Sequence, residues 1–205
     1  MEYNKLKTKE VTTMVIEALA KKNVQAFTVE SGKDALEKIK ELIPTGASVM
    51  NGASVTLEQI GFVDYLKSGE HGWNNLHEGI LAEKDPAIQA SLRKQAVLSD
   101  YYLGSVHALT ETGEYLIASN SGSQLPHIVF TSANLIFVVS TKKIVPNITE
   151  AMNRLMEYIM PIEDKHMKEK YGVGTVANKI LIVNGENGMM QRKVTMILVN
   201  EDLGF

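Results

Sequence analysis

Residues 135–140, LIFVVS, form the most continuous apolar run of β-type residues in this chain. A short run of this kind, without polar alternation, is typical of a strand buried on both faces in a parallel sheet. We therefore place it deep in the sheet. Lys142 and Lys143 follow at its end. These lysines could neutralise an acidic ligand, although a solvated lysine pair is the more common arrangement.

The N-terminal part of the chain alternates between helical and strand patterns. Apolar residues recur at helical spacing over residues 11–19, and residues 24–29, VQAFTV, have the composition of a strand. Ser31 and Asp34 form a capping-box pattern that begins a second helix, and the apolar run 47–50 is short enough for a second buried strand. This order predicts an α/β fold with a mainly parallel central sheet flanked by helices.

A loop of small residues, NGASVTLEQIG (51–61), follows the 47–50 strand. Glycine lets a ligand approach the main chain, and hydroxyl groups beside a helix start favour an anion such as phosphate or carboxylate. The alternative is structural: Thr56 caps the helix, Gln59 completes a capping box, and Gly52 relieves a tight turn. Both interpretations stay open. The candidate anion-binding residues in this loop are Asn51, Gly52, Ser54 and Thr56.

A β-hairpin is predicted from the strand-like runs 106–110 and 114–119, which Glu111, Thr112 and Gly113 separate. A carboxylate beside a glycine turn can be presented to a ligand, which makes Glu111 the candidate catalytic residue. The alternative is that Gly113 only supplies the positive φ of a hairpin turn and that Glu111 is solvated.

The remaining pattern predicts two more helices and a terminal hairpin. One helix begins at Asp85 and buries a stripe of Ile88, Leu92 and Ala96. The other has an apolar face over residues 148–159 and ends at Pro161. Residues 180–183 and 195–199, with Asn-Gly-Glu-Asn-Gly between them, are typical of a β-hairpin.

Composition limits the classes of function. The 205 residues fit a single domain, 1–205, and the net charge of −3 disfavours nucleic acid and acidic membranes as partners. The chain has no cysteine, so it cannot supply a thiolate or hold a cysteine-ligated cluster. His71 and His77 do not have the spacing of a metal site. We expect no metal and no cofactor in this chain. With no signal-type or membrane-spanning apolar segment, we expect a cytoplasmic protein.

Four segments resemble, in the same order, the LUD (lactate-utilisation) domain family in its stand-alone form, and the similarity extends over nearly the whole chain. They are NGASVTLEQIG (51–61), SVHALTETGEYL (105–116), LIFVVSTKKIVPNITEAMNRL (135–155) and MILVNEDLGF (196–205). The resemblance implies a fold of the ribose-5-phosphate isomerase, glucosamine-6-phosphate deaminase and CoA-transferase type. It also implies that the 51–56 loop holds phosphate or acyl groups. The acidic-glycine segment of the family falls on Glu111, Thr112, Gly113 and Glu114.

The chain differs from many stand-alone members of this family, which carry a cysteine-rich segment before the final strand. Residues 171–191, YGVGTVANKILIVNGENGMMQ, contain no cysteine. A redox role attached to such cysteines therefore does not transfer to this chain. Residues 121–127 also differ from the usual glycine- and asparagine-containing stretch of the family.

Two functions follow from these observations. The first is an enzyme or subunit that acts on a small carboxylate, lactate or pyruvate or an acyl-CoA-like molecule. In it, Glu111 is nucleophile or general base, the 51–56 loop and Thr112–Gly113 bind the ligand, and Lys142 or Lys143 adds charge. Redox centres would then belong to iron–sulfur partner proteins. The second is a non-catalytic metabolite-binding or assembly module of the same fold. A third hypothesis is that the site has lost its activity. For the oligomeric state, we expect a homodimer.

Overall fold

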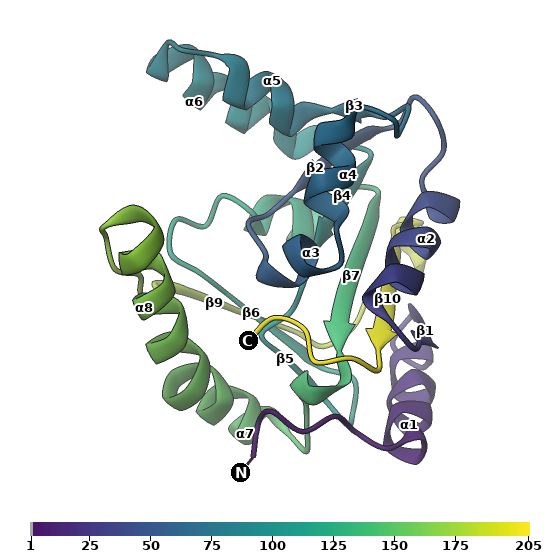
Figure 1. Ribbon diagram of the computed structural model, residues 1–205. Coiled ribbons are helices and arrows are strands. Elements are labelled where there is room, and N and C mark those ends of the chain that lie inside the picture. The colour runs from purple at the N-terminus through teal and green to yellow at the C-terminus, as the bar shows by residue number, and fades with distance from the viewer. Residues whose placement is uncertain (1) are drawn as a thin grey trace.

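The computed structural model describes residues 2–205 and confirms the predicted α/β fold (Figure 1). A central sheet of six strands, all parallel to their neighbours, has the order β1-β10-β7-β4-β2-β3. Its strands are β1 (Val24–Val29), β2 (Ser48–Asn51), β3 (Asn74–Asn75), β4 (Tyr101–Gly104), β7 (Asn134–Ser140) and β10 (Lys193–Val199). The run 135–140 lies in β7, between β10 and β4, as its apolar composition predicts.

A second, mixed sheet of four strands has the order β8-β5-β6-β9. It consists of β5 (Ala108–Thr110), β6 (Tyr115–Ser119), β8 (Ile144–Val145) and β9 (Lys179–Val183). Strands β5 and β6 pair antiparallel, which confirms the predicted hairpin. The chain enters this sheet from the carboxyl ends of β4 and β7 in the main sheet.

The prediction of a terminal hairpin is wrong. β9 pairs antiparallel with β6, whereas β10 pairs parallel with β1 and β7 in the other sheet. Burial explains the separation: Ile180 and Ile182 of β9 are about two-fifths exposed, but Ile197 and Leu198 of β10 are fully buried. A strand that is apolar on both faces gains more from an interior position in the main sheet than from pairing with its neighbour in sequence.

Helices cover one face of the main sheet, and α1 with the second sheet covers the other. Apolar residues of α2 (Gly32–Leu42), α3 (Val55–Gln59) and α4 (Phe62–Ser68) pack on the first face. Residues of α1 (Lys9–Ala20) and of β5 and β6 pack on the second. The capping box of Ser31 and Asp34 is present at the start of α2, as predicted.

The C-terminal helical region is longer than predicted. Pro161 does not end a helix: α7 (Ile148–Asn153) runs into a π-helical segment (Arg154–Ile159) and then into α8 (Met160–Tyr171). Pro161 stands at the second position of α8, directly after the π-helical segment, and the helical run continues through it. Short helical turns also occur at Ala96–Leu98, His127–Thr131, Thr141–Lys143 and Gly188–Met190.

The predicted buried stripe of Ile88, Leu92 and Ala96 is wrong in part. Asp85 caps α6 (Pro86–Gln95) as expected, but no residue of α6 is buried and Ile88 is half exposed; Ala96, directly after the helix, is buried. Together with α5 (Leu76–Ala82), α6 projects from the top of the molecule (Figure 1). Across residues 2–205, no helix has both the length and the apolar character needed to cross a membrane.

The different placement of β9 and β10 predicts unequal costs for the same substitution. Ile197→Ala removes buried methyl groups from the main sheet and should lower the free energy of unfolding by about 2–5 kcal/mol. Ile182→Ala, on the partly exposed β9, should cost less than about 1 kcal/mol. Urea unfolding of both variants measures the difference, and equal losses would contradict the two-sheet arrangement.

Candidate functional site

A cavity of about 210 Å³ lies where the loops after four parallel strands converge. The loop after β2 contributes Ser54 and Thr56, the loop after β4 contributes Ser105, and the residues after β7 and β10 contribute Lys143 and Gly204. Helix α8 and the end of β6 form the opposite wall. Open parallel sheets hold their ligands at this carboxyl edge, so the cavity has the position of a candidate binding site.

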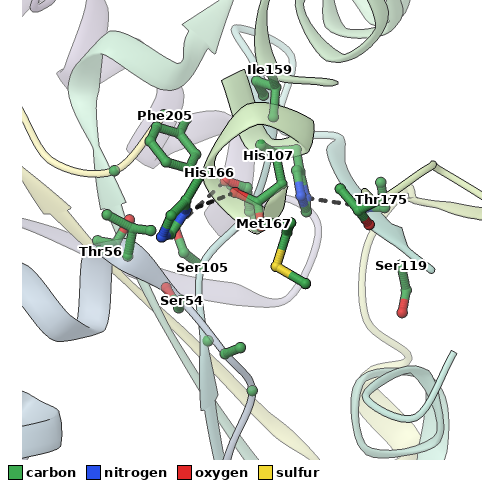
Figure 2. Close-up of a pocket in the computed structure, with 18 of the residues that line it drawn as sticks. Ser54, Thr56, Ser105, His107, Ser119, Ile159, His166, Met167, Thr175 and Phe205 are labelled. Atoms are coloured by element: carbon green, nitrogen blue, oxygen red, sulfur yellow. Dashed lines mark hydrogen bonds and ion pairs between the residues drawn. The ribbon is translucent and has the colours of Figure 1, made fainter. Parts of the chain in front are cut away.

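Hydroxyl groups surround the cavity on both sides. Figure 2 shows Thr56, Ser105 and Ser54 on one side, and Ser119 and Thr175 on the other, with Met167 between them. Several hydroxyls facing one small space can donate to or accept from a polar ligand.

Local structure in the 51–56 loop corrects the capping prediction. Ser54, not Thr56, is the N-cap of α3, and its Oγ accepts the Leu57 N–H at 3.3 Å. Gln59 does not complete a capping box; its Oε1 accepts the Gly204 N–H at 2.6 Å. The Thr56 side chain is buried and faces Lys143 instead.

Lys143 is the central group of the site. Only 4% of its surface is exposed, and its Nζ donates to Thr56 Oγ1 and Ser105 Oγ, each at 3.1 Å. Within residues 2–205, no carboxylate forms an ion pair with it. Burial, and then the positive charges of Arg154 and Lys142, hold the pKa of Lys143 well below its usual range. The solvated-pair interpretation is therefore wrong for this lysine.

Lys142 is buried too, but it is satisfied structurally. Its Nζ forms an ion pair with Asp202 and donates to the Gly204 carbonyl at 2.8 Å. It does not line the cavity. Instead it anchors the chain segment after β10, which passes the cavity at Gly204. Gly204 has φ +66°, and a Cβ there would collide with Thr56 Oγ1 and lie 2.8 Å from Lys143 Nζ.

A neutral histidine and a second buried cation lie behind Lys143. His107 lines the cavity, and its Nδ1 accepts the Ala118 N–H at 3.1 Å. Burial, Lys143 and Arg154 together lower the pKa of His107 to about 3, so the imidazole is uncharged near neutral pH. Arg154 is fully buried and donates to the His107 carbonyl, while its Nε and Nη2 have no hydrogen-bond partner in the described chain.

Two carboxylates on the cavity wall lie beside basic side chains. Glu58 is 3.2 Å from Lys170 Nζ, and Glu163 is 3.6 Å from His166 Nδ1, which makes an ion pair only when the imidazole is protonated. Lys143 and Arg154 are buried basic side chains for which no ion pair is found among residues 2–205.

Glu111 does not reach this cavity. It lies in the turn between β5 and β6, where its N–H donates to the Val145 carbonyl at 2.9 Å. Gly113 has φ +90° and packs against α1, as the hairpin-turn interpretation requires. Thr112 is exposed in the same turn, outside the cavity. The catalytic role of Glu111 stays a prediction, and no contact with the cavity supports it.

The turn does contain a charged network, centred on Glu114. Lys22 Nζ lies 2.8 Å from the Glu114 carboxylate, and hydrogen bonds from Lys22, Thr110 and Thr112 outweigh burial and lower the pKa of Glu114 to about 2. This network joins the turn to the end of α1, so its role is structural.

Of the predicted residues, the structure brings Gly52, Ser54, Thr56 and Lys143 together, and it places Asn51 in a neighbouring cavity that shares Gly52. Sequence reasoning missed Ser105, His107 and Arg154. Ser105 and His107 had a usable signal, because they follow a buried strand as the 51–56 loop does. No sequence signal pointed to Arg154, because the helix in which it lies was interpreted only from its apolar face.

Comparisons with known proteins agree with this architecture. The chain matches no curated protein. A crystal structure of a DUF162 family protein from Deinococcus radiodurans is similar in fold: its TM-score is 0.57 at 11% sequence identity, over 96% of this chain and 100% of that one. The family model for the LUD domain matches residues 12–197. That match runs from within α1 to within β10 and includes the loops that contribute Ser54, Ser105 and Lys143, and the chain therefore belongs to the LUD domain family.

Proposed function

We propose that the cavity binds a small carboxylate of the 2-hydroxy or 2-oxo acid class, to which lactate and pyruvate belong, with Lys143 as its counter-ion. The observation that carries this proposal is the buried Lys143 ammonium with two hydroxyl partners and no carboxylate within the described residues. An isolated buried cation is costly, and a bound anion offsets that cost.

The groups around Lys143 suit the rest of such a ligand. Thr56 and Ser105 hold the ammonium in place, and Ser54 lines the same wall. His107, uncharged near neutral pH, can hydrogen-bond a hydroxyl or carbonyl oxygen next to the carboxylate. Arg154, behind His107, adds positive potential without contacting the ligand.

The size of the cavity favours a small acid over an acyl-CoA. Pockets for drug-sized ligands have volumes of about 300–1,000 Å³, whereas this cavity has about 210 Å³. It can take a three-carbon acid whole. A CoA thioester could place only its acyl end there.

Oxidation of such an acid removes two electrons, which need an acceptor. Because the chain has no cysteine, a cysteine-ligated cluster would have to belong to a partner protein. We propose iron–sulfur proteins as these partners. The alternative, a metabolite-binding module without turnover, is favoured by one observation: Glu111, the predicted nucleophile or general base, does not line the cavity.

Lys143→Met tests the proposal directly. The variant should lose measurable lactate or pyruvate binding in isothermal titration calorimetry, because the counter-ion is removed. It should also raise the free energy of unfolding by about 1–4 kcal/mol, since an apolar side chain replaces a buried cation without a counter-ion.

Lys94→Met, on the exposed surface of α6, is the matched control and should change neither quantity. A Lys143→Met protein that binds lactate like the parent would overturn the proposed role of the ammonium. Loss of binding together with loss of stability would show that Lys143 is structural.

The lowered pKa of Lys143 predicts how binding depends on pH. A bound carboxylate favours the ammonium form, so affinity should be full below the pKa of Lys143 in the free protein. It should fall by up to about tenfold per pH unit as the pH rises through that value. Titrations of lactate binding by isothermal titration calorimetry from pH 6 to 10 measure this profile. A flat profile would argue against an ammonium counter-ion.

The variant Glu111→Gln tests whether ligand binding and turnover depend on the carboxylate in the hairpin turn. Since Glu111 does not line the cavity, we expect the variant to bind lactate within about twofold of the parent protein. Any turnover should also be kept. Loss of turnover with unchanged binding and stability would restore Glu111 as a catalytic residue, reached through a rearrangement of the turn.

A further inference from the structure

A second cavity, of about 170 Å³, adjoins the first across the 51–53 segment. Both cavities are lined by Gly52, Ala53 and Gln124. The second one is lined in addition by polar side chains that the proposed binding of a small acid does not use: Asn51, His77, Arg93, Tyr102, Ser123 and His127.

His127 is a buried and rigidly held member of this wall. It is 2% exposed, its ring stacks on Tyr102 with 4.5 Å between centroids, and its Nδ1 lies 2.9 Å from Ser132 Oγ and 3.2 Å from Ser99 Oγ. Its Nε2 has no hydrogen-bond partner within residues 2–205. Burial lowers the pKa of His127 to about 4 in the ligand-free protein. One imidazole nitrogen is therefore free for a ligand.

His77 is fixed in a similar way by Asn51. Its Nδ1 lies 3.3 Å from Asn51 Oδ1, and Asn51 Nδ2 donates to the Gly52 carbonyl at 3.2 Å, which orients the amide. An amide oxygen only accepts, so Nδ1 carries the proton and Nε2 is free. Arg93, near enough to lower the pKa of His77, has no carboxylate partner in the described chain.

The wall between the two cavities is thin and well ordered. Gln124 Oε1 accepts from the Tyr102 hydroxyl at 3.2 Å, and Gln124 Nε2 donates to the Ala118 carbonyl at 3.1 Å. A Cβ at Gly52 would collide with the Tyr102 hydroxyl. The two cavities are therefore neighbours that share the small residues of the 52–53 segment and the Gln124 side chain as their common wall.

We propose that the second cavity is a subsite for the phosphoryl group of the same ligand, so that the preferred ligand is a phosphorylated 2-hydroxy acid. This inference rests on the proposed function, because the carboxylate end of the ligand is the one held at Lys143. An arginine without a counter-ion beside two imidazoles with free nitrogens suits a phosphate, since guanidinium donates in pairs and each imidazole can take up a proton beside an anion. The subsite contains no carboxylate that would repel it.

A matched pair of ligands tests the subsite. D-Glycerate and 3-phospho-D-glycerate share the 2-hydroxy carboxylate and differ only by the phosphoryl group. By isothermal titration calorimetry at pH 7, we expect the phosphorylated acid to bind the full chain at least about tenfold more tightly. Arg93→Gln and His77→Gln should each remove most of that gain and leave D-glycerate affinity within about twofold. Lys94→Gln, next to Arg93 on α6 but outside the cavity, should change neither affinity.

The outcomes separate the two proposals. Equal affinities for the two acids would overturn the phosphoryl subsite, and so would an Arg93→Gln variant that still binds the phosphorylated acid more tightly than D-glycerate by the full factor. In either case, D-glycerate binding would still support Lys143 as the counter-ion. L-Malate carries a second carboxylate in place of the phosphoryl group. If it also binds about tenfold more tightly than D-glycerate, the second cavity is a carboxylate subsite and the phosphoryl proposal is wrong. No binding of either acid would overturn both proposals. Because Arg93 is exposed on α6, its substitution should leave the thermal unfolding temperature unchanged.

Discussion

The burial of the Lys143 ammonium is the constraint on which the rest of the site depends. Lys143 ends the short turn in which the chain leaves β7 of the main sheet and enters β8 of the second. Its side chain cannot escape to solvent there, because Thr56 and Ser105 from two neighbouring strand ends hold it. The connection between the sheets thus fixes a basic side chain inside the protein, and its hydrogen-bond partners there are the hydroxyl groups of Thr56 and Ser105.

Lys142 and Lys143 are neighbours in the chain but differ in their partners. Lys142 is paired with Asp202 and holds the segment after β10 in place, so its charge is offset within the chain. Lys143, one residue later, has no such partner among residues 2–205. A protein that only needed stability would gain by an apolar residue at this position. The proposed function accounts for a lysine at this position, because a bound carboxylate would supply the counter-ion that the described chain lacks.

Local signals in the sequence predicted much of the fold. The apolar run 135–140 and the capping box at Ser31 each depend on residues close together in the chain, and both are confirmed. The sheet to which β9 and β10 each belong depends on pairing with strands that are distant in the sequence. The short loop between them therefore wrongly indicated a hairpin. In the same way, nothing local in the Lys142–Lys143 pair tells which lysine is paired and which faces the cavity.

The candidate site was predictable only where one loop carried it. The 51–56 loop faces both cavities, with Asn51 toward His77 and Thr56 toward Lys143, and its small residues after the predicted 47–50 strand indicated ligand binding. Because the same short loop contributes to both walls, a shift that improves contacts with a ligand at one end changes the geometry at the other. A ligand that spans both cavities holds the loop from two sides, whereas a ligand in one cavity leaves the other end of the loop unconstrained. Because Gly52 and Ala53 line both cavities, the single ligand that we propose would contact this loop on both sides.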